Sequence, residues 1–478
     1  MPVTSVPCAP GRLPLAGHVH RLLRDPVGLL QALRDEGPIA AFHLGRRPVY
    51  VVNSPELLRR VLVTDAGSYV RGLAYERSRP ILGDGLATSD GEAHLRQRRL
   101  MLPSFHRARL LGYTGVMRAQ AEVLAGTWRD GQRVAMDRAL HRTSAAGALR
   151  ALFRTDLDDA TVAEIDDCVT VFLEEIPLRA VLPRFAERLP TPGNRRFARV
   201  AARLRRIVDG MVEERRRDPR ARDDLLSMLM AARDEDTGAA MTPRQVRDEV
   251  VTILAGGSET VPSTLSWLYY ELGRDPSVQE RLQDELDLVL EGRPAGFDDL
   301  PRLAYTRRVI DETLRLHSVA WMMSRRARTD AELGGHRIPA GAELLFSPTT
   351  LHRDPVLYPD PLRFDPDRWI SPPPRENFVP FGAGPRKCIG DHFSYIQMTV
   401  IVATVSARWS VSGVPGSRVR ERPAGALRPD VLPMTVSRRD PRSHGRHGHG
   451  GHGHGRAACA AASAAPASTV EDTTSYGV

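Results

Sequence analysis

The chain has 478 residues, of which 42% are hydrophobic and 26% are charged. These proportions are typical of globular proteins and exclude a wholly disordered chain, a collagen-like repeat and a protein with many membrane spans. The 67 basic residues exceed the 58 acidic ones by only nine, and no basic cluster with interleaved aromatic residues occurs, so we expect no nucleic-acid partner.

The beginning of the chain contains no apolar segment that could enter a membrane. Four prolines interrupt residues 1–15, so we expect neither a signal peptide nor a membrane anchor there, and we interpret residues 1–12 as a flexible segment. The cysteines show no paired spacing, which favours a reducing compartment. These observations predict a cytoplasmic protein.

The first half of the chain predicts a small sheet followed by a helical body. Val27–Arg34 has apolar residues at helical spacing, and Ile39–Phe42 and Pro48–Val52 are typical of two strands. From about residue 92 to residue 290 the pattern is almost entirely helical. Apolar residues three and four positions apart are clearest in the segments Leu110–Trp128, Thr161–Leu173 and Phe197–Arg216.

A long helix with a distorted middle is expected over Asp248–Leu272. The residues that interrupt its apolar pattern are Gly256, Gly257 and Pro262. Pro262 lacks the amide that would bond the carbonyl of Ser258, and glycines permit a local bulge. A groove there would let Glu259 and Thr260 hold water. The alternative is a helix crossing in which small residues allow close packing.

Charged residues and short strands follow. Glu312 and Arg315 stand three residues apart in the helical pattern Val309–Leu316, so both project from one face. Taken alone, such a pair is usually solvated. Leu333–Pro339 and Ala342–Phe346 are each expected to form a short strand.

The most specific segment is a glycine-rich loop with one cysteine. Residues 381–390 read Phe-Gly-Ala-Gly-Pro-Arg-Lys-Cys-Ile-Gly, and the helical pattern Phe393–Val402 follows. A thiol at a helix amino terminus meets amides and a dipole that favour its thiolate, and glycines let the backbone approach a large flat ligand. A haem iron fits that geometry; the alternatives are a buried structural thiol and a solitary nucleophile.

This loop matches Phe-x-x-Gly-x-Arg-x-Cys-x-Gly in full and so resembles the haem-ligand loop of the cytochrome P450 family. The resemblance implies that Cys388 binds the iron of haem b, with Phe381, Gly384, Arg386 and Gly390 around the cofactor. It also implies a mainly α (α+β) fold, in which a large helical domain and a small β-rich region hold the haem between the central oxygen helix and the cysteine loop.

Residues 257–260 resemble the family's oxygen-activation motif, Gly-x-Glu-Thr, which implies that Glu259 and Thr260 relay protons to dioxygen. In this chain Val261 stands where a second hydroxyl residue is common in the family, and Pro262 is an unusual neighbour of the motif.

Two further groups of residues match the family. Arg368 lies in the segment Asp-Pro-Asp-Arg-Trp, so the resemblance implies a buried structural triad of Glu312, Arg315 and Arg368. It also implies that cations neutralise the haem propionates, and the candidates are His94, Arg98, Arg325 and Arg386.

The chain is most similar to bacterial sesquiterpene-oxidising members such as albaflavenone synthase and pentalenene oxygenase. This implies a monooxygenase that inserts one oxygen atom from O2 into an unactivated C–H bond of a small apolar substrate, a sesquiterpene of secondary metabolism. The alternatives are another lipophilic substrate (fatty acid, polyketide or steroid), a peroxide-driven or rearrangement reaction, and a non-catalytic haem module. The expected pocket residues are Val251, Leu254, Ala255, Val319, Ala320, Trp321 and Met322.

The expected partners and domains follow from the same resemblance. No flavin or nucleotide fingerprint occurs, so we expect electrons from a separate ferredoxin and its reductase, received by a basic face with Arg386 and Lys387. We predict one haem-thiolate monooxygenase domain at 13–440, acting as a monomer, and a disordered His/Gly- and Ala-rich tail at 441–478. Whether the histidines of that tail bind a metal stays open.

Overall fold

The structure is a computed structural model that describes residues 6–153, 157–218, 224–234 and 236–439. The predicted tail lies outside these residues. Within them, no helix combines the length and the apolar character needed to cross a membrane. Residues 7–9, which belong to the segment expected to be flexible, pair with the first strand: the Ala9 amide donates to the Ala41 carbonyl and the Ala41 amide to the Pro7 carbonyl.

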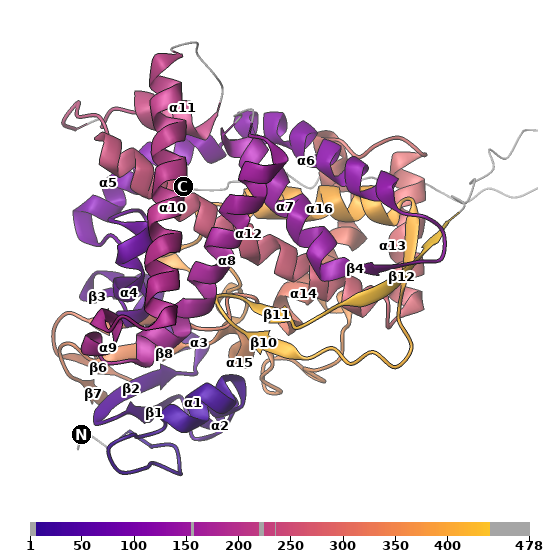
Figure 1. The fold of residues 1–478 in the computed structure, drawn as a ribbon. Helices are drawn as coiled ribbons and strands as arrows, with labels where there is room; N and C mark the ends of the chain where they lie inside the picture. The colour runs from indigo at the N-terminus through magenta and orange to yellow at the C-terminus, as the bar shows by residue number, and fades with distance from the viewer. Residues whose placement is uncertain (1–5, 154–156, 219–223, 235, 440–478) are drawn as a thin grey trace, which may run out of the picture. The chain divides into compact units, whose positions relative to one another are not determined.

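The helical body forms most of the molecule (Figure 1). Its longer helices are α4 (Leu73–Leu82), α5 (Gly91–Met101), α6 (Arg107–Thr127), α7 (Met136–Phe153), α8 (Asp159–Val181), α10 (Pro192–Arg217), α12 (Pro243–Leu272), α13 (Pro276–Leu290), α14 (Ala304–Leu316) and α16 (Asp391–Ser406). Shorter ones are α9 (Arg184–Arg188), α11 (Leu225–Ala231), η1 (Arg60–Thr64), η4 (Phe297–Arg302) and η5 (Pro366–Ile370). Helix α12 contacts α7, α8, α10, α14 and α16, so it lies at the centre.

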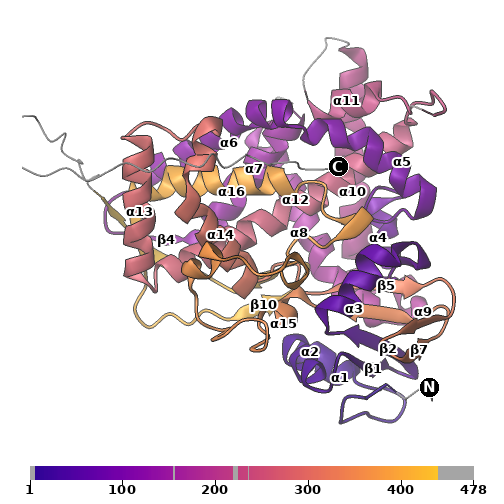
Figure 2. The same ribbon diagram turned by 180° about the vertical axis from the view of Figure 1, so that it is seen from behind.

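A five-stranded sheet joins early and late parts of the chain (Figure 2). Its strands, in spatial order, are β1 (Ile39–Leu44), β2 (Arg47–Val52), β8 (Glu343–Phe346), β5 (Met323–Ala327) and β3 (Tyr69–Arg71). Only β2 and β8 pair in parallel. Four short helices lie among the same chain segments: α1 (Val19–Arg24), α2 (Pro26–Asp35), α3 (Pro55–Arg59) and α15 (Pro348–His352). The strand predictions for the early sheet and for Ala342–Phe346 are confirmed.

Smaller sheets use the end of the described chain. The strand β4 (Gln132–Ala135) pairs with β12 (Pro433–Arg438), which also pairs with β9 (Trp409–Gly413), and β10 (Glu421–Pro423) pairs with β11 (Leu427–Pro429). The almost wholly helical interpretation of residues 92–290 missed β4. A strand of four residues gives too short an alternating pattern to be recognised between two long helices.

The prediction of one strand over Leu333–Pro339 was wrong. The segment forms a hairpin of β6 (Ala331–Leu333) and β7 (His336–Ile338). Its turn is Gly334-Gly335, with φ angles of +59° and +77°, a conformation that only glycine adopts readily.

The helix α12 is continuous from Pro243 to Leu272, with Pro262 inside it. The Thr242 side chain and Gln245 form a capping box at its beginning. The Ser258 carbonyl, which loses its helical partner at Pro262, lies 3.2 Å from Nε2 of His141 on α7. A side chain of a neighbouring helix thus takes the place of the missing amide.

Candidate active site

The cysteine loop is closed by two backbone hydrogen bonds just before α16. The Cys388 amide donates to the Phe381 carbonyl (2.9 Å), and the Lys387 amide donates to the Gly384 carbonyl (3.0 Å). Gly384 has a φ of +69°, and a Cβ at this position would collide with the carbonyl oxygen of Leu62 on η1. Gly384 is therefore required for packing of the loop against the chain. A Cβ on Gly390 would meet only ordinary contacts.

The Cys388 side chain is exposed, in a position with many protein atoms around it. Burial raises the pKa of the Cys388 thiol, and the hydrogen bond from the Gly390 amide and the charge of Arg98 act in the opposite direction. The helix terminus alone therefore does not make a thiolate here. A bound metal ion would produce the thiolate, because a coordinating thiol is deprotonated by the charge of the metal.

Two arginines face each other across the sheet beside this loop. Arg71 of β3 and Arg325 of β5 are directly opposite in the antiparallel register. Like charges in that relation repel each other, and Arg325 is only 5% exposed. The buried Nε of Arg71 has no hydrogen-bond partner among the described residues. An anion bound beside Arg71 and Arg325 would offset this repulsion and accept a hydrogen bond from the unpartnered Nε of Arg71.

Two further arginines and one histidine complete a cationic cluster. Arg386 donates to the Ser89 carbonyl (2.9 Å) and pairs with Asp90, and Arg98 donates to the Lys387 carbonyl (2.7 Å). Burial, with the charges of Arg386, Arg71 and other arginines, lowers the pKa of His94 to about 3, so its imidazole is neutral near pH 7. We call Arg71, His94, Arg98, Arg325 and Arg386 the cationic cluster.

The cationic cluster borders a cavity of about 140 Å³, whose lining includes His94, Arg325 and Arg386. Burial lowers the pKa of Arg386 to about 10, with the Arg71 charge adding to the effect, and the pKa of Arg325 falls to about 10 for the same two reasons. Both remain charged near pH 7. The structure therefore brings the four predicted propionate contacts together and adds Arg71, which the sequence analysis missed.

The two residues of the oxygen-activation motif lie on different faces of α12. Ile253, Gly256 and Thr260 are at least partly accessible on this central helix, and the Thr260 hydroxyl donates to the Gly256 carbonyl (2.9 Å). Glu259 is 3% exposed and its Oε1 lies 3.5 Å from Nε of Arg428 on β11. The structure does not bring the Glu259 carboxylate to the accessible face.

The predicted structural triad is assembled around Glu312. Arg315 donates to both Glu312 carboxylate oxygens at 2.8 Å, and neither side chain is exposed. Arg368 Nε lies 3.4 Å from Glu312 Oε1. The amide of Asp365 (2.9 Å) and the indole of Trp369 (3.1 Å) also donate to Glu312. One carboxylate thus ties α14 to the segment that precedes the cysteine loop.

The predicted pocket residues fall into two groups. Five of them are buried in apolar clusters: Val251, Leu254, Ala255, Val319 and Trp321. The Trp321 indole donates to the Ala424 carbonyl (2.9 Å). Ala320 and Met322 are partly accessible. Ile253, the partly accessible neighbour on α12, was not predicted, because the apolar pattern of this helix continues around its whole circumference.

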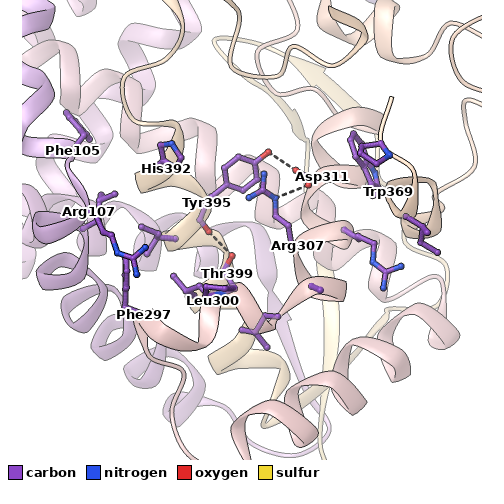
Figure 3. A pocket seen from close by; sticks show the side chains of 18 residues that line it. Phe105, Arg107, Phe297, Leu300, Arg307, Asp311, Trp369, His392, Tyr395 and Thr399 are labelled. Atoms are coloured by element: carbon purple, nitrogen blue, oxygen red, sulfur yellow. Dashed lines mark hydrogen bonds and ion pairs between the residues drawn. The ribbon is translucent and has the colours of Figure 1, made fainter. Parts of the chain in front are cut away.

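A groove of about 1120 Å³ borders α14, α16 and η4 (Figure 3). Arg307 donates to Asp311 (2.8 Å) and stacks on Tyr395, whose hydroxyl also donates to Asp311 (2.6 Å). Arg107, which is exposed, lies over the ring of Phe297. In this groove the charges of Arg307 and Asp311 neutralise each other, and apolar walls lie beside the exposed cation Arg107.

An iron-bound macrocycle with two carboxylates would complete both parts of the site, the accessible thiol and the cationic cluster, and proteins built around such a group form the haem-thiolate class. The chain belongs to the cytochrome P450 family: the sequence model of that family, described as Cytochrome P450, matches residues 7–434. It is accordingly a haem-dependent monooxygenase.

Three relatives and one solved structure show which proteins of the family this chain resembles. Cyclooctatin synthase of Streptomyces melanosporofaciens is 40% identical (89% of this chain, 94% of the relative), and cyclooctat-9-en-7-ol 5-monooxygenase of the same organism is 41% identical (90% and 95%). Pentalenene oxygenase of Streptomyces avermitilis is 38% identical (86% and 92%). The crystal structure of the cytochrome P450DA heme domain has a TM-score of 0.83 and 25% identity, covering 92% of this chain and 99% of that one. The predicted family and fold class are confirmed.

Arg71 gives the first testable prediction. An Arg71→Gln variant is expected to lose haem about tenfold faster or more, because one charge-assisted hydrogen bond contributes roughly 1.5–3 kcal/mol. The haem-free variant should be at least as stable as the haem-free parent, since the repulsion with Arg325 is relieved. Transfer of haem to an acceptor protein measures the first effect and urea unfolding the second. Arg46→Gln, at an exposed site, is the control; equal haem loss in both variants would exclude this role of Arg71.

Proposed function

We propose that this monooxygenase inserts one oxygen atom from O2 into an unactivated C–H bond of a cyclic terpene, with a sesquiterpene hydrocarbon as the first candidate. The observation that carries the proposal is the similarity, over at least 86% of the chain, to relatives named for cyclooctatin and pentalenene compounds. An oxygenated terpene is the second candidate, because one of these names specifies an alcohol as substrate.

Haem b, bound through Cys388, would supply the activation of dioxygen and the transfer of oxygen to carbon. The chain supplies the surroundings. The cationic cluster neutralises the two carboxylates of the cofactor and fixes its orientation. Thr260, on the accessible face of α12, would hold water by its hydroxyl. Glu259, whose carboxylate lies on another face of α12 beside Arg428, is proposed as the proton source for that water.

Which carbon of the substrate reacts depends on how the substrate is positioned in an apolar pocket. Ala320 and Met322 are the partly accessible members of the predicted lining, and Ile253 is a partly accessible neighbour of that lining on α12. Val251, Leu254, Ala255, Val319 and Trp321 support that lining from the apolar clusters in which they are buried.

A separate ferredoxin and its reductase supply the electrons to a monomeric enzyme in this proposal. Lys387 is 49% exposed beside the cysteine and pairs with Asp391 (2.6 Å). Arg386 is directed inward, to Asp90, so it belongs to the cationic cluster and contributes little to a basic docking face. Arg107, exposed at the groove of Figure 3, is a better candidate for that role.

Binding and turnover of terpenes test the function. Pentalenene and cyclooctat-9-en-7-ol should each be titrated into the haem-loaded protein, and we expect a low- to high-spin change of the haem spectrum with at least one of them. Turnover with ferredoxin, reductase and O2 should yield a product heavier by one oxygen atom. Product formed with peroxide but not with the electron-transfer proteins would favour the peroxide-driven alternative. A haem spectrum without any terpene response would overturn the substrate class and keep the enzyme class.

A further inference from the structure

His352, the last residue of α15, is a fully buried histidine that the proposed function does not use. Its Nδ1 lies 2.7 Å from the hydroxyl oxygen of Ser318, just after α14, and its Nε2 lies 3.0 Å from the amide nitrogen of Val379. One imidazole therefore joins three segments of the chain: the end of α14, the end of α15 and the segment that precedes the cysteine loop.

The neighbouring groups determine where this imidazole carries its proton. The Val379 amide can only donate a hydrogen bond, so Nε2 of His352 must accept it with a lone pair. The Ser318 hydroxyl shares its own proton between the carbonyls of Leu314 (2.9 Å) and Arg315 (3.2 Å), so its oxygen accepts from Nδ1. Burial, with the charge of Arg315, lowers the pKa of His352 to about 3, which agrees with a neutral ring. His352 is therefore the neutral tautomer with its proton on Nδ1.

Val379 begins the turn that leads into the cysteine loop. Its carbonyl accepts the Gly382 amide (3.0 Å), so residues 379–382 form a β-turn. The carbonyl of Phe381, in the middle of this turn, accepts the Cys388 amide (2.9 Å). A shift of the turn would therefore be transmitted to the backbone of the cysteine.

His352 is itself held firmly, and water cannot easily take its place. Its carbonyl accepts a hydrogen bond from Arg315 (2.8 Å), which is bound to Glu312, and its ring packs on that of Phe378 with the ring centroids 5.3 Å apart. Val379 is only 5% exposed, so little solvent reaches it. Without the imidazole, the Val379 amide would be a buried donor with no partner, which is costly.

We propose that His352 is a positioning residue for the haem ligand: its Nε2 holds the Val379 amide, and through the turn at 379–382 it fixes the backbone that presents Cys388 to the iron. If the turn shifts, the cysteine is no longer held where its thiolate can bind, and the electron donation that favours O–O cleavage is lost. This inference rests on the proposed binding of haem through Cys388 and is independent of the terpene substrate.

The lifetime of thiolate ligation tests this role. The haem-loaded protein is reduced under carbon monoxide, and the decay of its red-shifted Soret band to the unshifted band that marks loss of the thiolate is followed over time. His352→Leu leaves the Val379 amide unpaired, so we expect decay about tenfold faster or more than in the parent protein. In His352→Gln, the side-chain oxygen reaches the position of Nε2, and the decay should stay close to the parental rate.

His352→Asn completes this series. The asparagine side chain is one methylene shorter than that of glutamine, so it can replace Nδ1 but cannot reach the Val379 amide. We expect His352→Asn to decay as fast as His352→Leu. Because both amide variants keep a polar side chain, their comparison decides the question even if His352→Leu fails to bind haem. A parental decay rate in His352→Asn would overturn the inference.

His18 offers a matched control. It is also fully buried, its Nδ1 accepts the His43 amide (3.0 Å), and its Nε2 lies 2.9 Å from the Ala9 carbonyl. These bonds join the beginning of the chain to β1. His18→Leu should therefore lower the midpoint of urea unfolding, as His352→Leu does, but leave the decay of the Soret band unchanged. Equal acceleration in both variants would mean that His352 contributes only to general stability, and the proposed positioning role would be wrong.

The tautomer of His352 can be measured directly. Nitrogen-15 NMR of the reduced carbon monoxide complex, which is diamagnetic, distinguishes a proton on Nδ1 from one on Nε2, and His352→Gln assigns the signals. We expect the proton on Nδ1 at pH 7. A proton on Nε2, alone or together with one on Nδ1, would contradict the inference. A parent protein that does not respond to terpenes, with the variants decaying as expected, would instead contradict only the proposed substrate.

Discussion

A Cys388→Ala variant will fold, and its reduced form will lack the strongly red-shifted Soret band that the parent protein gives with carbon monoxide. The loop is closed by backbone groups and by the packing of Gly384 against η1, none of which needs the thiol. Because the side chain is exposed, its loss should change the free energy of unfolding of the haem-free protein by about 0.5 kcal/mol or less. Oxygenation of any substrate should fall to background.

Cys168→Ala is the matched control for this variant. Cys168 is buried in the largest apolar cluster, so its replacement leaves a small void and costs about 1 kcal/mol of unfolding free energy. The Soret band with carbon monoxide should be unchanged. A red-shifted band that persists in Cys388→Ala would show that another residue binds the iron.

Glu312→Gln should produce the largest loss of stability among the variants considered for this protein. The Arg315 guanidinium, which is fully buried, would lose its charged partner, and removing one member of a buried ion pair costs about 3–5 kcal/mol. Urea unfolding of the haem-free protein measures this loss as a lower midpoint. Haem retention should also decrease, because the Asp365 and Trp369 contacts order the segment that leads to the cysteine loop.

An ion pair on the surface nearby provides the comparison. Asp367 pairs with Arg281 (2.9 Å) and Arg308 (3.2 Å), and all three side chains are at least one quarter exposed. Asp367→Asn should therefore cost about 1 kcal/mol or less. Equal losses in Glu312→Gln and Asp367→Asn would mean that burial of the triad adds nothing to its strength.

The parts of the site that are contiguous in sequence could be predicted. The cysteine loop and the spacing of Glu312 and Arg315 are local patterns. One turn of helix is enough to place Glu312 and Arg315 on a common face. The same holds for the helices, whose period is repeated over many residues. The Gly334-Gly335 turn was available in the sequence and was overlooked, since the flanking strands have only three residues each.

The remaining parts depend on long-range packing. Arg71 becomes part of the cationic cluster only through the register between β3 and β5, which are about 250 residues apart in the chain. The rotation of α12, which separates the directions of Glu259 and Thr260, is set by the elements packed around it. An apolar pattern on all sides of this helix does not distinguish the face that is buried by packing from the face that stays partly accessible.

The parallel pairing of β2 with β8 has a consequence for the order of events during synthesis. Val49 pairs with Glu343, so the hairpin of β1 and β2 leaves the ribosome nearly 300 residues before its partner strand exists. Until then β2 presents an unpaired edge, which is a site for association with other chains. The sheet that holds Arg71 and Arg325 closes only when most of the chain has been made, so haem capture belongs to the last stage of folding. Nascent chains of this protein are therefore expected to depend on chaperones more than a chain with local strand pairing would.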